Sequence, residues 1–387
     1  MSDRPSTGDA RRRFALSRLT LTDFRCYVQL RLDTEARPVV LYGDNGAGKT
    51  NILEAISMLV PGRGFRRPKL SELARSGGDG RWAVAATVKT PAGSVQLGTG
   101  FTPPEMSEGR ERRQVRVDGE TVSNLNVLAD YFATHWLVPQ MDRLFIDGAS
   151  GRRRFLDRLV FDWDPAHSGR ITAYEQAARD RLKLLRDNVS PDPAWLSALE
   201  DTMAGRAVAV AAARIELLAR IGQAAADGMA PFPGALLALD GLVERWLTEG
   251  PALEAEDRFR DRLAGERRRD AEQGRTDSGP HRADLLVRHS AKDEAAERCS
   301  TGEQKALLIA IILANARVRA DEEGGVPVLL LDEVAAHLDE TRRGALFDHL
   351  VDLGVQAWLT GTDAALFAGL QGQAQFFSVD HGTVTAV

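Results

Sequence analysis

The segment at residues 43–50, GDNGAGKT, constrains this chain more than any other part of its sequence. It follows an apolar run at 38–42 that predicts a buried strand, and it precedes a helical pattern at about 50–60. A loop of the form G-x-x-x-x-G-K-[ST] between a strand and a helix is the arrangement that wraps a phosphate group. The sequence therefore predicts an α/β core with a phosphate-binding loop.

Each part of this loop has a chemical role. The glycines allow backbone N–H groups to turn toward a β-phosphate, and the helix N-terminus adds its dipole. We expect Lys49 to reach β- and γ-phosphate oxygens and the Thr50 hydroxyl to coordinate Mg²⁺. The residues predicted to bind nucleotide are Gly43, Asp44, Asn45, Gly46, Ala47, Gly48, Lys49, Thr50 and Asn51.

Two adjacent carboxylates follow a second apolar run. Residues 328–331 read VLLL and predict a buried strand, and Asp332 and Glu333 come directly after it. Ligand sites in open α/β sheets lie at the carboxyl ends of the strands. We expect Asp332 to hold Mg²⁺ through water. Glu333, which would point the other way along an extended backbone, is the predicted catalytic group that accepts a proton from the attacking water.

A second anion site is predicted at residues 300–304, STGEQ, where a helix begins. A serine hydroxyl, a glycine that permits close approach and a helix N-terminus together favour an anion. The pattern S-x-G-x-Q, followed by Lys305, resembles the signature of ABC ATPases. The resemblance implies that each nucleotide is clamped between the phosphate loop of one copy and Ser300, Thr301, Gly302 and Glu303 of another. The alternative is an ordinary helix N-cap.

The remaining pattern predicts the architecture. We expect a hairpin at 16–33, antiparallel strands within 82–117 and a short strand at 135–139. Helical spacing covers 152–265, including 238–250, and 264–298 is charged and rich in turn formers. A helix at about 301–317, the strand at 327–331, a helix at 340–354, a strand at 356–361 and two C-terminal strands complete the chain.

These elements predict an α/β ABC-type ATPase head with an inserted helical arm lobe. Its mixed sheet would be built from both ends of the chain, with a P-loop core and an antiparallel β part. The predicted division is a basic disordered arm at 1–13, head segments at 14–150 and 266–387, and the helical lobe at 151–265. Transport ATPases are disfavoured, because Ser300 lies too far along the chain from Thr50. Prolines interrupt the lobe and argue against a long coiled coil.

The chain resembles the RecF family of bacterial recombination mediator ATPases over nearly all residues after the arm. The resemblance rests on the phosphate loop, the signature and LDE at 331–333 with Leu338 and Asp339 after it. It also rests on LTDFRCY at 21–27, DGASGRRRFLD at 147–157, GPHRADL at 279–285 and TGT at 360–362. These motifs are specific enough to separate this family from other ABC-type ATPases.

The resemblance implies a protein that dimerises on binding ATP and Mg²⁺, grips double-stranded or gapped DNA, and releases it by slow, DNA-stimulated ATP hydrolysis. It further implies action with RecR and RecO in loading RecA at gaps, during recombinational repair, replication restart and the SOS response to DNA damage. Asp339 would lie at the dimer seam. Thr50, Asp332 and Gln140 would surround the metal, with Gln140 as a Q-loop glutamine that also serves catalysis.

Two features leave alternatives open. No histidine occurs at 360–363, where many ABC ATPases carry a switch histidine, which is consistent with slow hydrolysis. His281 would either make a structural hydrogen bond in its turn or take part in catalysis.

The net charge of −5 counts mildly against nucleic-acid binding, but the arginines are clustered. Such clusters permit a basic groove, although most charge runs are solvated surface. The arginines predicted to contact DNA are Arg63, Arg66, Arg67, Arg112, Arg113, Arg152 and Arg153.

Other considerations narrow the class. The sequence has no apolar segment that predicts a membrane span or a signal peptide and only two cysteines, so we expect a cytoplasmic protein with no membrane partner. The residues after Asp339 are too few for a nuclease domain, which disfavours an ATPase fused to a nuclease. An ATP-driven scaffold that binds repair proteins and touches DNA only weakly remains an alternative.

Overall fold

A computed structural model describes residues 14–90, 92–106, 112–187, 192–322 and 325–387. The predicted arm at 1–13 lies outside the described residues. The chain forms two compact units: unit 1 comprises the residues up to Pro139 together with Ala316–Val387, and unit 2 is Gln140–Asn315. Unit 2 thus extends on both sides of the predicted lobe at 151–265, and the functional division of the chain stays a prediction.

The first sheet of unit 1 is antiparallel throughout, in the order β2-β1-β4-β5-β6-β7. The predicted hairpin and antiparallel strands are confirmed. Alternate residues of β1 and β4 are buried, so this sheet has one packed face and one open face. Its strands are β1 (Ala15–Phe24), β2 (Tyr27–Asp33), β4 (Trp82–Thr90), β5 (Gly93–Phe101), β6 (Gln114–Val117) and β7 (Glu120–Val122).

The second sheet of unit 1 has the order β15-β14-β3-β13-β12-β8 and is parallel except at β15. Strands from both ends of the chain take part in it, with β3 between β14 and β13, which confirms the predicted mixed sheet. Its strands are β3 (Val39–Tyr42), β8 (Thr134–Leu137), β12 (Val328–Leu331), β13 (Ala357–Gly361), β14 (Gln375–Asp380) and β15 (Thr383–Ala386). Strands β8, β12 and β13 are buried along their whole length.

Two α-helices lie wholly within the described part of unit 1, α1 (Lys49–Ser57) and α8 (Glu340–Leu353). Helix α7 (Thr301–Asp321) begins in unit 2 and ends in unit 1. Short 3₁₀ helices connect the other elements: η1 (Leu70–Leu73), η2 (Pro104–Met106), η3 (Leu125–Asp130), η4 (Pro139–Arg143), η6 (Ala335–His337) and η7 (Ala364–Leu370).

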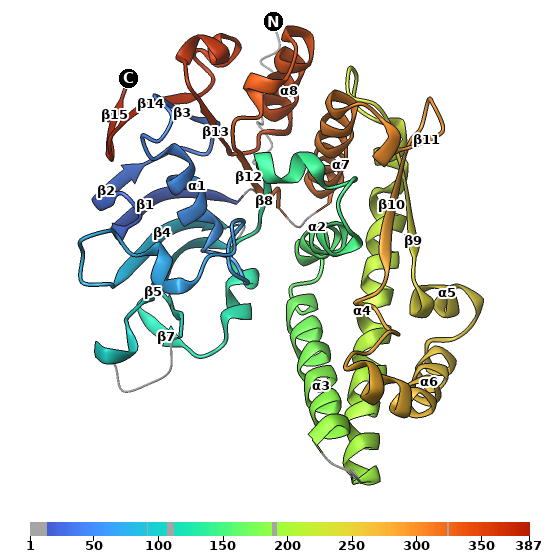
Figure 1. Cartoon of the computed structure of the whole chain (residues 1–387). Helices are drawn as coiled ribbons and strands as arrows, with labels where there is room; N and C mark the ends of the chain where they lie inside the picture. The colour runs from blue at the N-terminus through green and yellow to red at the C-terminus, as the bar shows by residue number, and fades with distance from the viewer. Residues whose placement is uncertain (1–13, 91, 107–111, 188–191, 323–324) are drawn as a thin grey trace, which may run out of the picture. The chain divides into compact units, whose positions relative to one another are not determined.

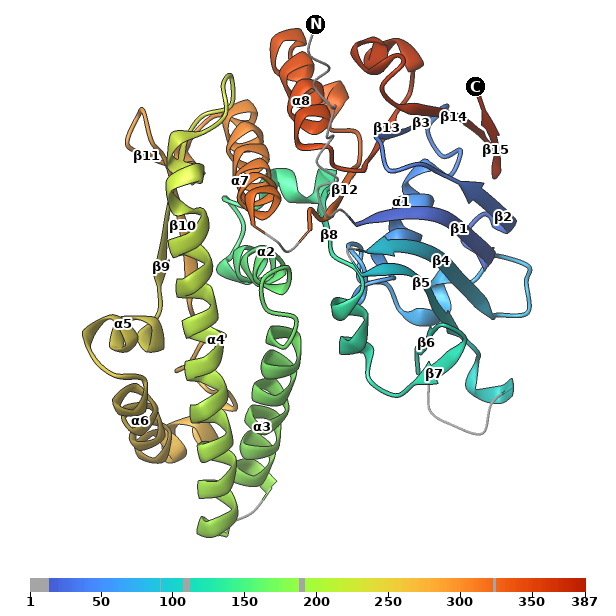
Figure 2. The same cartoon turned by 180° about the vertical axis from the view of Figure 1, so that it is seen from behind.

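Unit 2 is mainly helical, and α3 and α4 lie side by side in both views (Figures 1 and 2). Small residues on α4, such as Ala204, Ala207 and Ala211, pack with Tyr174 and Phe259 in a common core and allow the helices to approach closely. The helices are α2 (Ala149–Phe161), α3 (His167–Asp187), α4 (Pro193–Asp227), α5 (Leu242–Glu249) and α6 (Ala252–Gln273), with η5 (Ala296–Arg298) before α7.

Unit 2 also contains a sheet that the sequence analysis missed. Strands β9 (Ala235–Asp240), β10 (Asp284–His289) and β11 (Glu294–Ala295) form it in the order β11-β10-β9. The helix predicted over 238–250 is wrong for its first residues, because 235–240 pair with β10 along their whole length. The turn-rich assignment of 264–298 is wrong where α6, β10 and β11 lie.

The described residues contain no helix that combines the length and the apolar character needed to cross a membrane.

Candidate nucleotide site

The glycine-rich loop connects β3 to α1, as predicted, and two of its glycines have no possible substitute. Gly43 has a φ of 148°, and a Cβ there would lie 2.1 Å from the backbone oxygen of Val379 on β14. Gly48 has a φ of 117° and forms the N-cap of α1, where a Cβ would lie 2.7 Å from the Tyr27 hydroxyl. The loop therefore needs glycine for its conformation and for its packing.

Lys49, the first residue of α1, is folded back over this loop. Its Nζ donates hydrogen bonds to the backbone oxygens of Gly43 at 2.6 Å and Asp44 at 2.7 Å. Burial lowers the pKa of Lys49 below its ordinary value of 10.5, and the carboxylates of Glu333, Asp332 and Asp44 oppose this effect. The loop thus holds a buried ammonium group at its centre.

Asp332 links the loop to the end of β12. Its Oδ1 accepts hydrogen bonds from the Thr50 hydroxyl at 2.9 Å and the Thr360 hydroxyl at 2.8 Å. Burial raises the pKa of Asp332, and these two hydrogen bonds counteract the rise. In the described chain, no hydrogen bond involves the other carboxylate oxygen, Oδ2. The structure therefore brings Thr50 and Asp332 together, as the two motifs predicted.

Glu333 follows Asp332 but does not continue the extended backbone. The predicted extended conformation is wrong, because Glu333 has a φ of 55°. The chain turns at this point toward η6, and the backbone N–H of Glu333 donates to the Thr360 hydroxyl at 2.8 Å. The side chain is half-buried beside the loop lysine.

The donor set fits a nucleotide with a divalent cation. Asp332 and the hydroxyl of Thr50 offer hard oxygen ligands, and Mg²⁺ is usually held by few protein oxygens together with phosphate and water. The described residues contain no group of three or more His, Cys, Asp or Glu side chains that could bind a metal alone. Among the described residues, the backbone N–H groups of Gly46 and Gly48 have no protein acceptor, so they are available to phosphate oxygens.

The predicted signature forms the start of α7. The Ser300 hydroxyl donates to the Glu303 carboxylate at 2.9 Å, and the Ser300 N–H donates to the same carboxylate at 3.0 Å. The ion pair with Lys292 and the Ser300 hydrogen bonds lower the pKa of Glu303 to about 2. Ser300 and Glu303 are therefore a reciprocal helix cap, which accounts for their identity without any ligand.

Gly302 has no such explanation. It lies exposed with Thr301 in the first turn of α7, and a Cβ there would meet nothing within 4 Å. Glycine lowers helix stability compared with alanine by about 1 kcal/mol. Among the described residues, no contact requires a glycine at this position, and Gly265 in α6 is equally uncrowded, so the role of Gly302 in a shared nucleotide site stays a prediction.

Two other predicted site residues lie in short or terminal helical positions. Gln140 is exposed in η4, which begins at the boundary between the units. Asp339 is the N-cap of α8, and its side chain accepts a hydrogen bond from the backbone N–H of Arg342 at 2.8 Å. Their proposed roles in catalysis and at a dimer seam stay predictions.

The arginines predicted to contact DNA fall into two groups. Arg63, Arg66 and Arg67 are exposed after α1, and Arg112 is exposed before β6. Arg152 is largely engaged inside unit 2, where it forms an ion pair with Asp284 at 2.7 Å. Arg153, also half-buried in unit 2, donates to the backbone oxygen of Ala283 at 2.7 Å.

Arg113 is the clearest departure from that prediction. Its side chain is buried, and its guanidinium donates to the backbone oxygens of Met58 and Gly62, the latter at 2.7 Å, and to the Thr99 hydroxyl at 2.7 Å. These carbonyls follow the last turn of α1. Arg113 therefore caps the C-terminus of the loop helix and has no surface to offer to DNA.

Thr360 is a site residue to which the sequence analysis assigned no role. It lies on β13, is 1% exposed, and contacts both acidic residues of the site. The sequence analysis included Thr360 in the TGT motif at 360–362 and in the segment where a switch histidine was sought, but nothing in the sequence indicated its contacts with Asp332 and Glu333.

Comparison with known proteins supports a single family. The model described as "RecF/RecN/SMC N terminal domain" matches residues 15–385. A DNA replication and repair protein RecF from Mesorhizobium japonicum is 51% identical over 372 residues, which cover 95% of this chain and 97% of that protein. Its counterpart from Allorhizobium ampelinum is 49% identical over 369 residues, 95% of this chain and 97% of that protein.

Solved structures show the same fold. A recombination mediator protein RecF solved with ATP has a TM-score of 0.83 at 21% identity, covering 98% of this chain and 99% of that one. An Smc head bound to the C-winged helix domain of ScpA has a TM-score of 0.56 at 15% identity, covering 96% and 97%. With these relatives and the loop geometry in agreement, the chain belongs to the RecF family of DNA replication and repair proteins.

Proposed function

We propose that this protein is an ATP-driven DNA clamp that acts in recombinational repair and replication restart. Two copies would bind two ATP molecules with Mg²⁺, close on double-stranded or gapped DNA, and release it after slow, DNA-stimulated hydrolysis. The proposal includes a cytoplasmic location and action with RecR and RecO in loading RecA at gaps in DNA.

One observation carries the nucleotide part of this proposal: Thr50 and Thr360 both donate to one oxygen of Asp332, beside the buried ammonium group of Lys49. The Thr50 hydroxyl keeps its lone pairs for a cation, because its hydrogen is given to Asp332. Asp332 keeps Oδ2 for a metal-bound water. When bound, Mg²⁺ would neutralise charge on the β- and γ-phosphates. Glu333 would then orient the attacking water and accept its proton.

The shared site rests on Gly302. Its missing side chain serves no contact in this chain, whereas the γ-phosphate of a nucleotide held by a second copy would need to approach the first turn of α7 closely. Asp339 and Gln140 are proposed to complete the dimer seam and the metal environment.

The DNA part rests on the family and on the exposed arginines 63, 66, 67 and 112. We retain these four as candidate phosphate contacts. Arg152 and Arg153 are weaker candidates because they serve contacts within unit 2, and Arg113 is withdrawn because it is buried.

The decisive experiment is the molar mass in solution by light scattering. Glu333→Gln should suppress turnover and form a dimer only with ATP and Mg²⁺, more strongly with a gapped duplex present. Lys49→Met should stay monomeric, whereas Lys89→Met, which removes an exposed lysine of β4, should behave as the parent. A mass for Glu333→Gln that ATP does not change would contradict the shared site.

The acidic net charge and the internal engagement of several arginines favour one second candidate, an ATP-driven scaffold that binds repair proteins and touches DNA weakly. Fluorescence anisotropy on gapped DNA separates the two functions. The clamp requires an affinity that rises with ATP and falls steeply with salt. An affinity that is weak and independent of ATP would favour the scaffold.

A further inference from the structure

The hydroxyl of Thr360 forms hydrogen bonds with both acidic residues at the end of β12. It lies 2.8 Å from Oδ1 of Asp332 and 2.8 Å from the backbone nitrogen of Glu333. The contacts join positions that are 28 and 27 residues apart in sequence, so they depend on the parallel pairing of β12 with β13.

The direction of both hydrogen bonds follows from the chemistry of the groups. An ionised carboxylate can only accept and a backbone N–H can only donate. The single hydrogen of the Thr360 hydroxyl therefore points to Asp332, and one of its lone pairs accepts from Glu333. A threonine or serine can make this pair of contacts, and an apolar side chain of the same shape can make neither.

The backbone of Glu333 needs such support. Its φ of 55° lies in the left-handed region, which a residue with a Cβ adopts at a cost unless its surroundings hold it there. Without the Thr360 oxygen, the N–H of Glu333 would lose its acceptor, and the backbone would lose a contact that opposes relaxation to an extended conformation. An extended Glu333 would aim its carboxylate in a different direction.

We propose that Thr360 is the positioning residue for hydrolysis: its hydroxyl holds Glu333 in the left-handed conformation that aims the carboxylate at the attacking water, and at the same time orients Asp332. This inference rests on the proposed ATPase function and adds a requirement to it. Nucleotide binding depends mainly on the loop and Lys49, and in the described chain no hydrogen bond joins the Thr360 hydroxyl to either. Loss of the hydroxyl should thus affect turnover far more than affinity.

The test compares Thr360→Val, which keeps the shape and removes the hydroxyl, with Thr360→Ser, which keeps the hydroxyl. Thr385→Val is the control, since Thr385 is an exposed threonine of β15, in the same sheet as Thr360. The measurements are the kcat of ATP hydrolysis, the Kd for a fluorescent ATP analogue with Mg²⁺, and the dimer fraction at saturating ATP.

Thr360→Val should lower kcat by about 10-fold to 100-fold, the range expected for a displaced reacting group. Its nucleotide Kd should stay within about 3-fold of the parent, and its ATP-bound dimer should persist as in Glu333→Gln. Thr360→Ser should recover most of the turnover, and Thr385→Val should lose none. If Thr360→Val does not fold, Thr360→Ala is measured and judged by the same criteria.

Unchanged turnover in the variant without the hydroxyl would overturn the inference. So would a parallel loss of kcat and nucleotide affinity that Thr360→Ser does not restore, because that result indicates a general structural role. Failure of the proposed function would look different: the unmodified protein would then neither bind ATP nor hydrolyse it.

Discussion

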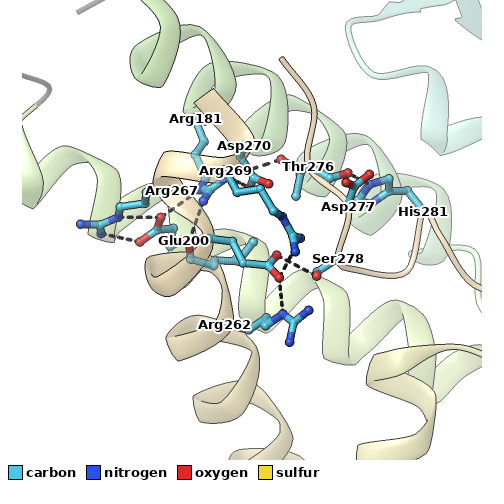
Figure 3. A network of polar contacts seen from close by, with 12 residues as sticks. Arg181, Glu200, Arg262, Arg267, Arg269, Asp270, Thr276, Asp277, Ser278 and His281 are labelled. Carbon is cyan, nitrogen blue, oxygen red and sulfur yellow. Dashed lines mark hydrogen bonds and ion pairs between the residues drawn. The ribbon is translucent and has the colours of Figure 1, made fainter. Parts of the chain in front are cut away.

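Arg181 of α3 and Asp270 of α6 form an ion pair in the interior of unit 2, with 2.7 Å between Nη1 and Oδ2 and neither side chain exposed. The same guanidinium donates to Glu200 of α4 at 2.9 Å (Figure 3). It also donates to the backbone oxygen of Leu263 at 2.7 Å. One side chain therefore joins three helices, and Arg267 adds a second positive charge beside Glu200.

Removing Arg181 should be severely destabilising. Arg181→Met keeps much of the volume but leaves Asp270 without its cation and Glu200 with Arg267 alone, which should lower the stability of unit 2 by about 3–5 kcal/mol. Hydrogen exchange of the α3 and α4 amides measures this local free energy of opening. The control is Arg268→Met, because Arg268 pairs with Glu272 on the surface of α6 and is 92% exposed. Equal exchange rates in the two variants would refute the argument.

His281 should make the stability of unit 2 depend on pH. Its Nε2 lies 2.8 Å from the backbone oxygen of Thr276, which can only accept, so this nitrogen carries the hydrogen. In the neutral ring Nδ1 is then an acceptor, and the Tyr174 hydroxyl 2.8 Å away donates to it. Protonation would reverse this hydrogen bond, so that Nδ1–H donates to the Tyr174 oxygen. Burial lowers the pKa of His281 below its ordinary value of 6.5, and the nearby Arg282 acts in the same direction.

The sign follows from the proton count. Just below pH 6.5 the unfolded chain binds a proton at His281 that the folded chain does not, so stability falls as the pH falls. Hydrogen exchange at pH 7.5 and 5.5 should show a larger loss of protection in the parent than in His281→Gln, which cannot titrate. His381→Gln, at an exposed histidine, should keep the parent's dependence. A pH dependence that is the same in parent and His281→Gln would exclude the neutral histidine as its source.

Some elements of the fold can be predicted from their own residues, and others depend on distant parts of the chain. Long periodic segments, such as the strands of unit 1 and helix α8, were predicted because their own residues specify them. Strand β9 was not, since ALLALD at 235–240 consists of good helix formers and is a strand only through its pairing with β10. The hydrogen-bond partners of His281 could not be predicted either, because Tyr174 lies 107 residues away in sequence and Thr276 contributes only its backbone oxygen.

The site shows the same limit. The phosphate loop and the Asp332–Glu333 pair are local patterns, so the sequence predicts their chemistry directly. Thr360 contacts them only through strand pairing, and the left-handed backbone of Glu333 has no local signature. Arg113 belongs to an arginine-rich stretch of polar sequence, and nothing in that stretch distinguishes a buried guanidinium from an exposed one.

Arg113 should matter for stability and not for DNA contact. Arg113→Met leaves the buried carbonyl of Met58 without its guanidinium donor, at a cost of about 1–3 kcal/mol, and also removes the half-buried hydrogen bond to Gly62. The DNA affinity of this variant, plotted against salt concentration on logarithmic axes, should keep the parent's slope. Each lost phosphate contact would reduce that slope by about 0.9. Arg112→Met, at the exposed neighbour, is the control for stability and should leave it unchanged. A smaller slope in Arg113→Met would indicate that Arg113 contacts a DNA phosphate and would contradict this prediction.

A substitution at Gly302 distinguishes the two interpretations of residues 300–304, an ordinary helix cap and part of a shared nucleotide site. Gly302→Ala should stabilise the start of α7 by up to about 1 kcal/mol, because alanine favours the helix and its Cβ meets no atom within 4 Å. The same Cβ would stand between the helix N-terminus and a phosphate of the nucleotide bound by the second copy, so ATP-dependent dimerisation should weaken.

Gly265→Ala on α6 is the matched control for Gly302→Ala, because Gly265 is exposed and equally uncrowded. It should stabilise its helix and leave the dimer intact. If both variants dimerise equally well with ATP, the first turn of α7 is a capped helix start, and the γ-phosphate must be bound elsewhere.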